Sequence, residues 1–447
     1  MKRQYEAPTI IRHQAGLINK VAHQAVAGHR DSIGGVPVST LIERYGSPLF
    51  VFDEHHIRTR YREVLSTIRA HYPDTDISWS YKTNYLGAIC SIYHQEGARA
   101  EVVSRMEYDM ARRLGVPGKD ILFNGPGKRR EDLLLAVEEG ALIHIDHLDE
   151  MVMIEQVADE LGMRPRVAIR VNMDTGIYPQ WQRFGFNYDN GEAWRAAQRL
   201  VAGGKLELEG VHCHIGTFML EPNAYYISTA KLLALALRLR DELNVTVSYV
   251  DIGGGFASSN TLHAQYMPGE LASPGFDRFA TAIGSAMNES QFVREEHPRL
   301  MLETGRALID EAGSMISTVI GRKYLPTGVR ALILDAGVSV LFTSWWYNLK
   351  VTPAQPLSGS TQPTTFFGPL CMNIDVVKNS CMFPDMRNGE RVIVSPVGAY
   401  NVTQWMQFIE YRPAVALVTE TGGTELIRER ESLQDVIGRE RLPEHLA

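Results

Sequence analysis

The strongest constraint on the fold is a regular alternation of short β-favouring runs and amphipathic helical segments. Eight such runs, rich in β-branched residues, occupy residues 77–82, 98–104, 121–125, 141–147, 167–172, 208–216, 247–255 and 300–306. Helical patterns lie between them, at residues 106–114, 130–139, 148–161, 192–202, 224–243 and 277–287. This alternation predicts an α/β fold with a closed, TIM-like (β/α)8 barrel. An open doubly wound sheet is the alternative, and it differs by a reversal of strand order.

The pattern changes after residue 306, where strand-like runs follow one another without helices between them. These runs occupy residues 314–319, 330–336, 365–367, 391–396, 414–418 and 425–428. We therefore predict three parts: an N-terminal arm (1–45) that packs on a β-domain, a barrel (46–309), and a C-terminal β-rich barrel or sandwich (310–447). The polar stretch 353–364, which is rich in Pro, Ser and Thr, is expected to form a loop.

Charge and composition exclude several classes of protein. The net charge is −7, and no window combines clustered Lys and Arg with aromatic residues, which argues against a nucleic-acid surface. No apolar run is long enough for a membrane span, and the first twenty residues lack the pattern of a secretory signal. The four cysteines show no CxxC spacing, so we expect neither disulfides nor zinc, and a cytoplasmic location.

A lysine stands at the C-terminal end of the first barrel strand, within Ser80-Tyr81-Lys82-Thr83-Asn84. In a dry site an ammonium group loses hydration, so we expect a lowered pKa for Lys82. A neutral amine there can attack a carbonyl, such as the aldehyde of pyridoxal phosphate (PLP), to form a Schiff base. Taken alone, the more ordinary interpretation is a solvated surface lysine.

Other strand ends carry polar or glycine-rich groups, and this is where a βα barrel places its active site. They are Glu101 and Ser104, Arg170, His212 to Thr217, Asp251 to Phe256, and Glu303 to Arg306. The Gly253-Gly254-Gly255 run would let backbone N–H groups approach an anion, although a flexible turn explains it equally well. No dinucleotide fingerprint or P-loop is present.

His212 and His214 lie two residues apart on a strand, so their side chains share one face. A metal pair would need a third ligand, and none follows at an obvious spacing, so we predict no metal site. We expect one histidine to pack in the core and the other to reach the barrel mouth. In the second domain, Cys371 and Tyr400 taken singly are ordinary packing residues.

Together these stretches resemble the fold-type III PLP-dependent decarboxylases, the group of diaminopimelate, ornithine and arginine decarboxylases. The resemblance begins near Gly46 and rests on YKTN, EVVSRME, FNGPGK, AIRVN, RFGF, HCHIGT, DIGGGF, ETGR, GPLC and GAY in this order. It implies an alanine-racemase-like barrel joined to a β-domain, with PLP as cofactor and an α-amino acid as substrate.

The resemblance also implies a role for each matching residue. Lys82 would form the Schiff base, His214 would stack on the cofactor ring, and Glu303 would face the ring nitrogen. Glu101 and Arg170 would lie close to the ring. The phosphate would be held by Thr217, Gly254, Gly255, Gly305, Arg306 and Tyr400. Cys371 would come from the second subunit of a homodimer and protonate the product carbanion.

The sequence departs from this family where the distal end of the substrate would bind. Met372 follows the cysteine, where diaminopimelate and ornithine decarboxylases have an acidic residue for the distal ammonium. Trp345 and Trp346 suggest an aromatic pocket. We therefore expect a substrate without a free distal ammonium, such as an acylated, conjugated or carrier-linked amino acid of a siderophore or natural-product pathway. The alternatives are a diaminopimelate decarboxylase of lysine biosynthesis and a non-catalytic PLP-binding protein.

Overall fold

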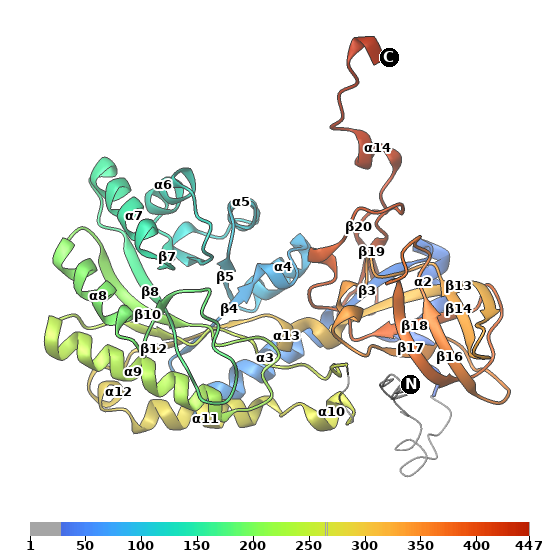
Figure 1. Cartoon of the computed structure of the whole chain (residues 1–447), viewed down its shortest axis with the longest axis horizontal. Coiled ribbons are helices and arrows are strands. Elements are labelled where there is room, and N and C mark those ends of the chain that lie inside the picture. Colours follow the sequence, from blue (N-terminus) through green and yellow to red (C-terminus); the bar gives the residue numbers. More distant parts are fainter. Residues whose placement is uncertain (1–27, 264, 266, 447) are drawn as a thin grey trace, which may run out of the picture.

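A barrel and a β-rich domain lie side by side in the computed structural model, which describes residues 28–263, 265 and 267–446 (Figure 1). The barrel is a closed sheet of parallel strands, because β10 pairs with both β11 and β8. The predicted closed barrel is thus confirmed, and the open sheet is wrong. Its strands are β4 (Thr75–Ser80), β5 (Arg99–Val102), β6 (Ile121–Phe123), β7 (Leu142–Ile145), β8 (Arg166–Asn172), β10 (Glu207–Cys213), β11 (Tyr249–Asp251) and β12 (Arg299–Thr304).

Helices surround this sheet because each presents one apolar face to it. In α3 (Glu54–His71) the buried residues Ile57, Tyr61, Val64 and Ile68 recur at helical spacing, while the polar residues between them face outward. The other helices are α4 (Gly87–Gln95), α5 (Arg105–Arg113), α6 (Arg130–Glu138), α7 (Leu148–Leu161), α8 (Glu192–Gly203), α9 (Asn223–Leu243), α10 (Gly269–Ala272), α11 (Phe276–Glu289), α12 (Gln291–Glu296) and α13 (Arg306–Ile309). The short strand β9 (Phe186–Asn187) adds to the edge of β8.

The β-domain contains one strand that the prediction assigned elsewhere. Strand β3 (Leu49–Asp53) pairs with β13 and β19, so residues 49–53 belong to this sheet although the predicted barrel range starts at residue 46. Partners so distant in sequence cannot be read from local pattern. The other strands are β13 (Gly313–Tyr324), β14 (Arg330–Leu334), β15 (Lys350–Pro353), β16 (Gln362–Phe367), β17 (Val376–Phe383), β18 (Arg391–Ser395), β19 (Ala414–Val418) and β20 (Thr424–Arg428).

Two of these strands, β15 and β17, were not predicted. The expected loop at 353–364 is correct for residues 354–361, whereas Pro353 ends β15 and residues 362–364 begin β16. Strand β17 contains the polar run Lys378-Asn379-Ser380, which hides its β pattern. It pairs only with β16, at the end of its sheet, where polar residues are tolerated.

The described part of the N-terminal arm packs against the β-domain. It forms β1 (Ser32–Ile33), β2 (Val36–Pro37) and α2 (Val38–Tyr45). Leu41 and Ile42 of α2 share one apolar cluster with Leu49, Val51 and Ile316 of the β-domain sheet. The remainder of the predicted arm, residues 1–27, lies outside the described residues.

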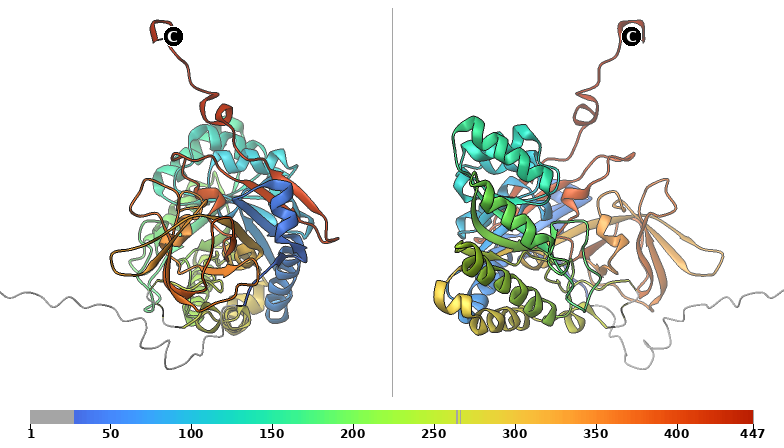
Figure 2. Two further views of the ribbon diagram at one scale, coloured as in Figure 1. Left: turned by 90° about the vertical axis from the view of Figure 1, so that its right-hand side faces the viewer. Right: turned by 60° about the vertical axis from the view of Figure 1, so that its left-hand side comes forward.

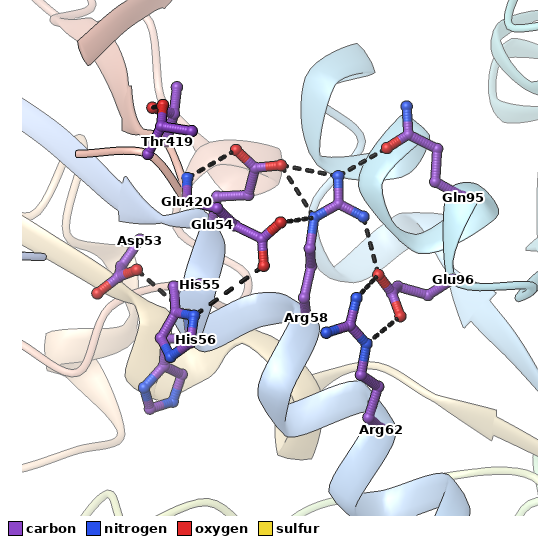
Figure 3. Close-up of polar contacts among 11 residues, drawn as sticks. Asp53, Glu54, His55, His56, Arg58, Arg62, Gln95, Glu96, Thr419 and Glu420 are labelled. Atoms are coloured by element: carbon purple, nitrogen blue, oxygen red, sulfur yellow. Dashed lines mark hydrogen bonds and ion pairs between the residues drawn. The ribbon is translucent and has the colours of Figure 1, made fainter. Parts of the chain in front are cut away.

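An ion-pair cluster joins the two domains where α3 and α4 meet the turn between β19 and β20 (Figure 3). Arg58 of α3 donates to Glu54 at 2.7 Å and to Glu96 at 2.8 Å, and it lies 3.4 Å from Glu420 of the turn. Glu96 also accepts from Arg62 at 2.7 Å. Because Arg58 of the barrel pairs with Glu420 of the β-domain, these ion pairs link the barrel helices directly to the β-domain.

The C-terminal segment after β20 leaves the body of the molecule and ends at a distance from both domains (Figures 1 and 2). It contains the short helix α14 (Leu433–Ile437), which begins with a capping box between Ser432 and Asp435. Among the described residues, no helix has the length and apolar character needed to span a membrane.

Candidate active site

Lys82 lies at the barrel mouth, directly after β4, in the 3-10 turn η1 (Tyr81–Thr83). Strand β4 is flanked by β12 and β5, so the lysine is held between two strand ends. Its ammonium group donates a hydrogen bond to Glu101 of β5. About a third (35%) of the Lys82 side chain is exposed, so the amine is accessible from the barrel mouth.

The expected lowering of the pKa of Lys82 is wrong for this arrangement. Burial does act to lower the pKa of the amine, but the negative charge of Glu101, assisted by Tyr400 and Glu303, acts in the opposite direction. The pKa of Lys82 is raised above its ordinary value as a result. A local sequence pattern cannot show this outcome, since Glu101 lies on a different strand.

Two buried carboxylates, Glu101 and Glu303, face the lysine from β5 and β12. Glu101 accepts hydrogen bonds from Ser80, Lys82 and Asn124. Glu303 accepts from Asn124 at 2.5 Å, and its Oε2 lies 3.2 Å from Nε2 of His212. Glu101 and Glu303, which were selected because they lie at strand ends, are far apart in the chain but lie together at the barrel mouth.

The two histidines of the HCHIGT motif occupy different layers. His212 is buried beside Glu303, and burial lowers its pKa well below the ordinary value. His214 is half-buried, and its Nδ1 accepts the N–H of Gly254 at 3.0 Å. Burial lowers the pKa of His214 to about 3, so its imidazole is neutral at physiological pH. A neutral ring packed edge-on against Trp181 can stack on a flat ligand.

A further buried cluster, defined by His144, His212, Asp251 and Glu303, brings ligand-type atoms within 4.8 Å of one another. Two of its members are bonded to neighbours through one atom each: His144 lies 3.0 Å from the hydroxyl of Tyr249, and Asp251 accepts the N–H of Gly253 at 2.8 Å. Their second polar atoms, Nδ1 of His144 and Oδ2 of Asp251, have no partner among the described residues. We interpret the cluster as the polar support of Glu303.

The glycine run after β11 adopts a backbone that favours glycine. Gly253 and Gly255 have φ values of +68° and +94°, in the left-handed region. A Cβ on Gly254 would lie 2.1 Å from the carbonyl oxygen of Glu303, and one on Gly255 would lie 2.2 Å from that of Gly216. The loop therefore packs tightly onto neighbouring strand ends, where the resemblance expects the phosphate.

Arg306 supplies a cationic group with an unused donor. Its guanidinium lies 5.0 Å from the ring centre of Tyr347 and 4.8 Å from that of Tyr400. Nη1 of Arg306 is buried and has no hydrogen-bond partner in the described part of the chain, and the carboxylate oxygen of Asp310 lies 3.8 Å away. A buried donor without a partner is costly unless a ligand meets it, so this group fits an anion such as a phosphate.

The β-domain contributes Tyr400 to the barrel mouth. The backbone N–H of Tyr400 donates to the carbonyl of Thr83 at 2.9 Å, one residue after the lysine. Tyr400 has a left-handed φ of +61°, unusual for a residue with a side chain. The site therefore lies at the junction of the two domains.

The remaining predicted residues occupy several positions. Gly305 packs against Thr83, and Arg170 is buried 3.5 Å from Asp146. Thr217 is exposed in the loop after β10.

The predicted acid and substrate residues lie on the β-domain. Cys371 is exposed and Met372 half-buried, between β16 and β17. Trp345 and Trp346 are exposed. Within the described part of the chain, no hydrogen bond or aromatic contact joins these four residues to Lys82.

Sequence reasoning missed Asn124, His144 and Tyr347. Asn124 directly follows β6, and His144 lies on β7. The strand-end rule itself would have found Asn124, had it been applied to the third strand as it was to the others. Tyr347 directly follows Trp345 and Trp346 in the stretch expected to form an aromatic pocket, but no contact with Arg306 was expected for it.

The side chains at the barrel mouth fit PLP. Lys82 offers an amine, Glu303 a buried carboxylate, His214 a neutral ring, and Arg306 a donor without a partner. These are the groups that an aldehyde, a ring nitrogen, a ring face and a phosphate require.

Comparisons with known proteins support the same assignment. Residues 55–310 match the family described as "Pyridoxal-dependent decarboxylase, pyridoxal binding domain". Diaminopimelate decarboxylase of Methanocaldococcus jannaschii is 27% identical over 93% of this chain and 95% of its own length. The Bacillus subtilis diaminopimelate decarboxylase is 26% identical over 94% of this chain and 97% of its own.

Solved structures agree in both domains. The crystal structure of diaminopimelate decarboxylase from M. jannaschii has a TM-score of 0.86 at 26% identity, covering 94% of this chain and 98% of that one. A structure of the same enzyme with L-lysine has a TM-score of 0.85 at 26% identity, covering 95% and 99%. The match over residues 55–310, which includes Lys82 and Glu303, shows that the chain belongs to the pyridoxal-dependent decarboxylases, carboxy-lyases that use PLP.

Proposed function

We propose that this enzyme decarboxylates meso-diaminopimelate, releasing CO2 to give lysine. The observation that supports this most is the extent of similarity: the diaminopimelate decarboxylases match the β-domain as well as the barrel. The relative from M. jannaschii was also solved with L-lysine, which is the expected product. This substrate replaces the acylated or carrier-linked amino acid expected from the sequence as the leading candidate.

The proposed roles follow from the charges at the site. Bound PLP supplies the electron sink that accepts the electron pair left at Cα when CO2 departs. Glu303, which accepts from Asn124 and lies beside His212, would keep a ring nitrogen protonated and so keep that sink deep. The cationic guanidinium of Arg306 would bind the phosphate, and the neutral His214 ring would hold the ring face.

Protonation of the product carbon is proposed to come from the Cys371 thiol of a second copy of this chain. Cys371 is exposed on its own chain, which leaves it free to reach another. Asp375 holds the segment that carries Cys371, because it accepts the N–H groups of Val338 at 2.7 Å and Leu370 at 2.8 Å. The arrangement requires a homodimer with shared active sites.

Mixing two inactive variants tests the shared site. Lys82→Ala and Cys371→Ala homodimers should each lack most activity, whereas a mixed dimer would contain one intact site. When the two chains are co-expressed and pair at random, half of the dimers are mixed and each of these has one intact site of two. The preparation should therefore show about a quarter of wild-type turnover, and sedimentation should show a dimer. A mixed preparation as inactive as its parents would contradict the shared site.

A panel of substrates tests the reaction. We expect CO2 release from meso-diaminopimelate, with lysine identified by mass spectrometry, and weaker activity on ornithine, lysine and arginine. Rescue of a lysine auxotroph by the gene would support the assignment. Absence of CO2 release from meso-diaminopimelate at millimolar concentration would refute it.

Met372 supports a second candidate, the decarboxylation of an amino acid whose distal amine is acylated or conjugated. A buried ammonium beside a thioether lacks the charge or hydrogen bond that it needs. In the same panel, an Nε-acylated substrate with at least tenfold higher kcat/KM than the free diamino acid would favour this candidate. Equal or lower values would exclude it.

A further inference from the structure

One amide group joins the two carboxylates that flank Lys82. Asn124 follows β6, and its Nδ2 lies 3.0 Å from Oε1 of Glu101 and 2.5 Å from Oε1 of Glu303. Glu101 comes from β5 and Glu303 from β12, the two strands on either side of the lysine strand β4. The amide therefore bridges the two carboxylates that come from either side of the lysine strand.

The chemistry of the neighbours determines which way the amide points. Ionised carboxylates can only accept hydrogen bonds, so the amide nitrogen must be the atom that faces them. The opposite atom, Oδ1 of Asn124, is buried and has no partner within residues 28–263, 265 and 267–446. In this orientation the amide nitrogen donates to both carboxylates, while the amide oxygen is left without a donor. A buried unsatisfied oxygen is unfavourable, so the two hydrogen bonds to the carboxylates are the interaction that this side chain provides.

The loop that carries Asn124 is held rigidly. The backbone N–H of Asn124 donates to the carbonyl of Val102 at 2.8 Å, and Gly125 has a left-handed φ of +91°. The buried Lys128 donates to the carbonyl of Gly125 at 2.7 Å and pairs with Glu150 at 2.6 Å. The FNGPGK motif thereby places one amide between two carboxylates.

The charges around the bridge come from all sides of the barrel. The charged or acidic groups that face Glu101 and Glu303 are Lys82, Glu107, Arg170 and Asp251. The groups that are neutral at physiological pH are His144, His212, His214, Cys213 and Tyr249. Several acidic groups thus lie close together at this site, so each hydrogen-bond donor to a carboxylate reduces the repulsion between them.

We propose that Asn124 is a positioning residue: its amide holds the carboxylate that binds Lys82 and the carboxylate assigned to the PLP ring nitrogen in one geometry. The inference rests on the proposed roles of Lys82 and Glu303. Without the amide, two like charges face each other with one donor fewer each, and protonation of one of them becomes easier. Either the ion pair of Lys82 or the contact to the ring nitrogen is then weakened.

Two variants test this in the PLP-loaded enzyme. Asn124→Asp has the same shape but adds a third carboxylate, and Asn124→Ala removes the donor without adding charge. Both should weaken PLP binding, measured by fluorescence without substrate, at least tenfold at pH 6.5. The acid limb of PLP affinity, and that of kcat/KM, should move to higher pH by about one unit, and further for Asp than for Ala.

Asn172→Ala is the matched control. Asn172 is also buried at a strand end, as the last residue of β8, but its amide nitrogen donates to the neutral carbonyls of Phe184 and Gly185. Its removal costs stability but should leave the acid limb in place.

An acid limb that moves no more in Asn124→Ala than in Asn172→Ala would overturn the proposal. Asn124→Ala alone decides the question if the Asp variant does not fold. Because PLP binding is measured without substrate, these results stay informative even if the proposed substrate is wrong.

Discussion

Two dense charge clusters in this protein have opposite characters. At the domain junction, Arg58 lies among three carboxylates and one amide (Figure 3), and none of the buried side-chain atoms of Arg58, Glu54 or Glu96 lacks a hydrogen-bond partner within the described chain. The hydrogen bond from Arg62 holds the pKa of Glu96 below its ordinary value, although the burial of Glu96 acts in the opposite direction. This cluster is complete, and its effect is to fasten α3 and α4 to the β-domain.

At the barrel mouth, by contrast, several buried atoms have no hydrogen-bond partner among the residues that the structure describes. They are Oγ1 of Thr83, Oδ1 of Asn124, Nδ1 of His144, Nδ1 of His212, Oδ2 of Asp251 and Nη1 of Arg306. Unpaired buried groups reduce stability and persist where a ligand or a reaction uses them. The comparison separates a cluster built for stability from one built for chemistry.

The largest effect should follow replacement of Lys82. Lys82→Ala removes the amine, so turnover should fall by at least about a thousandfold, since covalent attachment is lost. Wild-type protein mixed with PLP should show a yellow imine band, and borohydride should fix the label on Lys82. A wild-type protein without this band, or a label on another residue, would contradict the assignment.

Glu303→Gln should have the next largest effect. Losing one partner of a buried charged pair costs about 3–5 kcal/mol, and each 1.36 kcal/mol of barrier is tenfold in rate. We expect turnover to fall by at least about a hundredfold, measured as CO2 release at saturating substrate. A decrease below about fivefold would rule out Glu303 as the partner of the ring nitrogen.

At the junction, Arg58→Met should reduce stability and leave the chemistry intact. Three carboxylates would lose a shared guanidinium at a cost of about 1–3 kcal/mol, and the apparent Tm should fall by several degrees. Arg62→Met is the matched control, because this side chain is 59% exposed and should contribute less. A tenfold loss of kcat/KM at 25 °C in Arg58→Met would show that the junction also serves catalysis.

The smallest effect concerns acid stability. Burial lowers the pKa of His144, His212 and His214 in the folded state, so the unfolded chain binds more protons at acid pH. Stability should therefore decrease as the pH falls below about 6.5, and continue to decrease towards pH 3. His144→Gln should flatten the dependence of Tm on pH between 7 and 5, compared at equal PLP concentration. An unchanged slope would contradict a neutral buried His144.

The pattern of the chain alone determined the barrel, the C-terminal β-domain and the position of Lys82, because strand and helix periods are local properties. The motif order also predicted roles for Glu303, His214 and Arg306, which lie with Lys82 at the barrel mouth. Helix α7 was found at its predicted bounds, 148–161, for the same reason.

Only the tertiary structure decided which side chains meet. It placed β3 in the β-domain sheet and brought Asn124 between Glu101 and Glu303. It also reversed the expected pKa shift of Lys82, since that shift depends on a carboxylate from another strand. Pairing between distant strands and the field of distant charges arise from the closed barrel, and no window of sequence contains them.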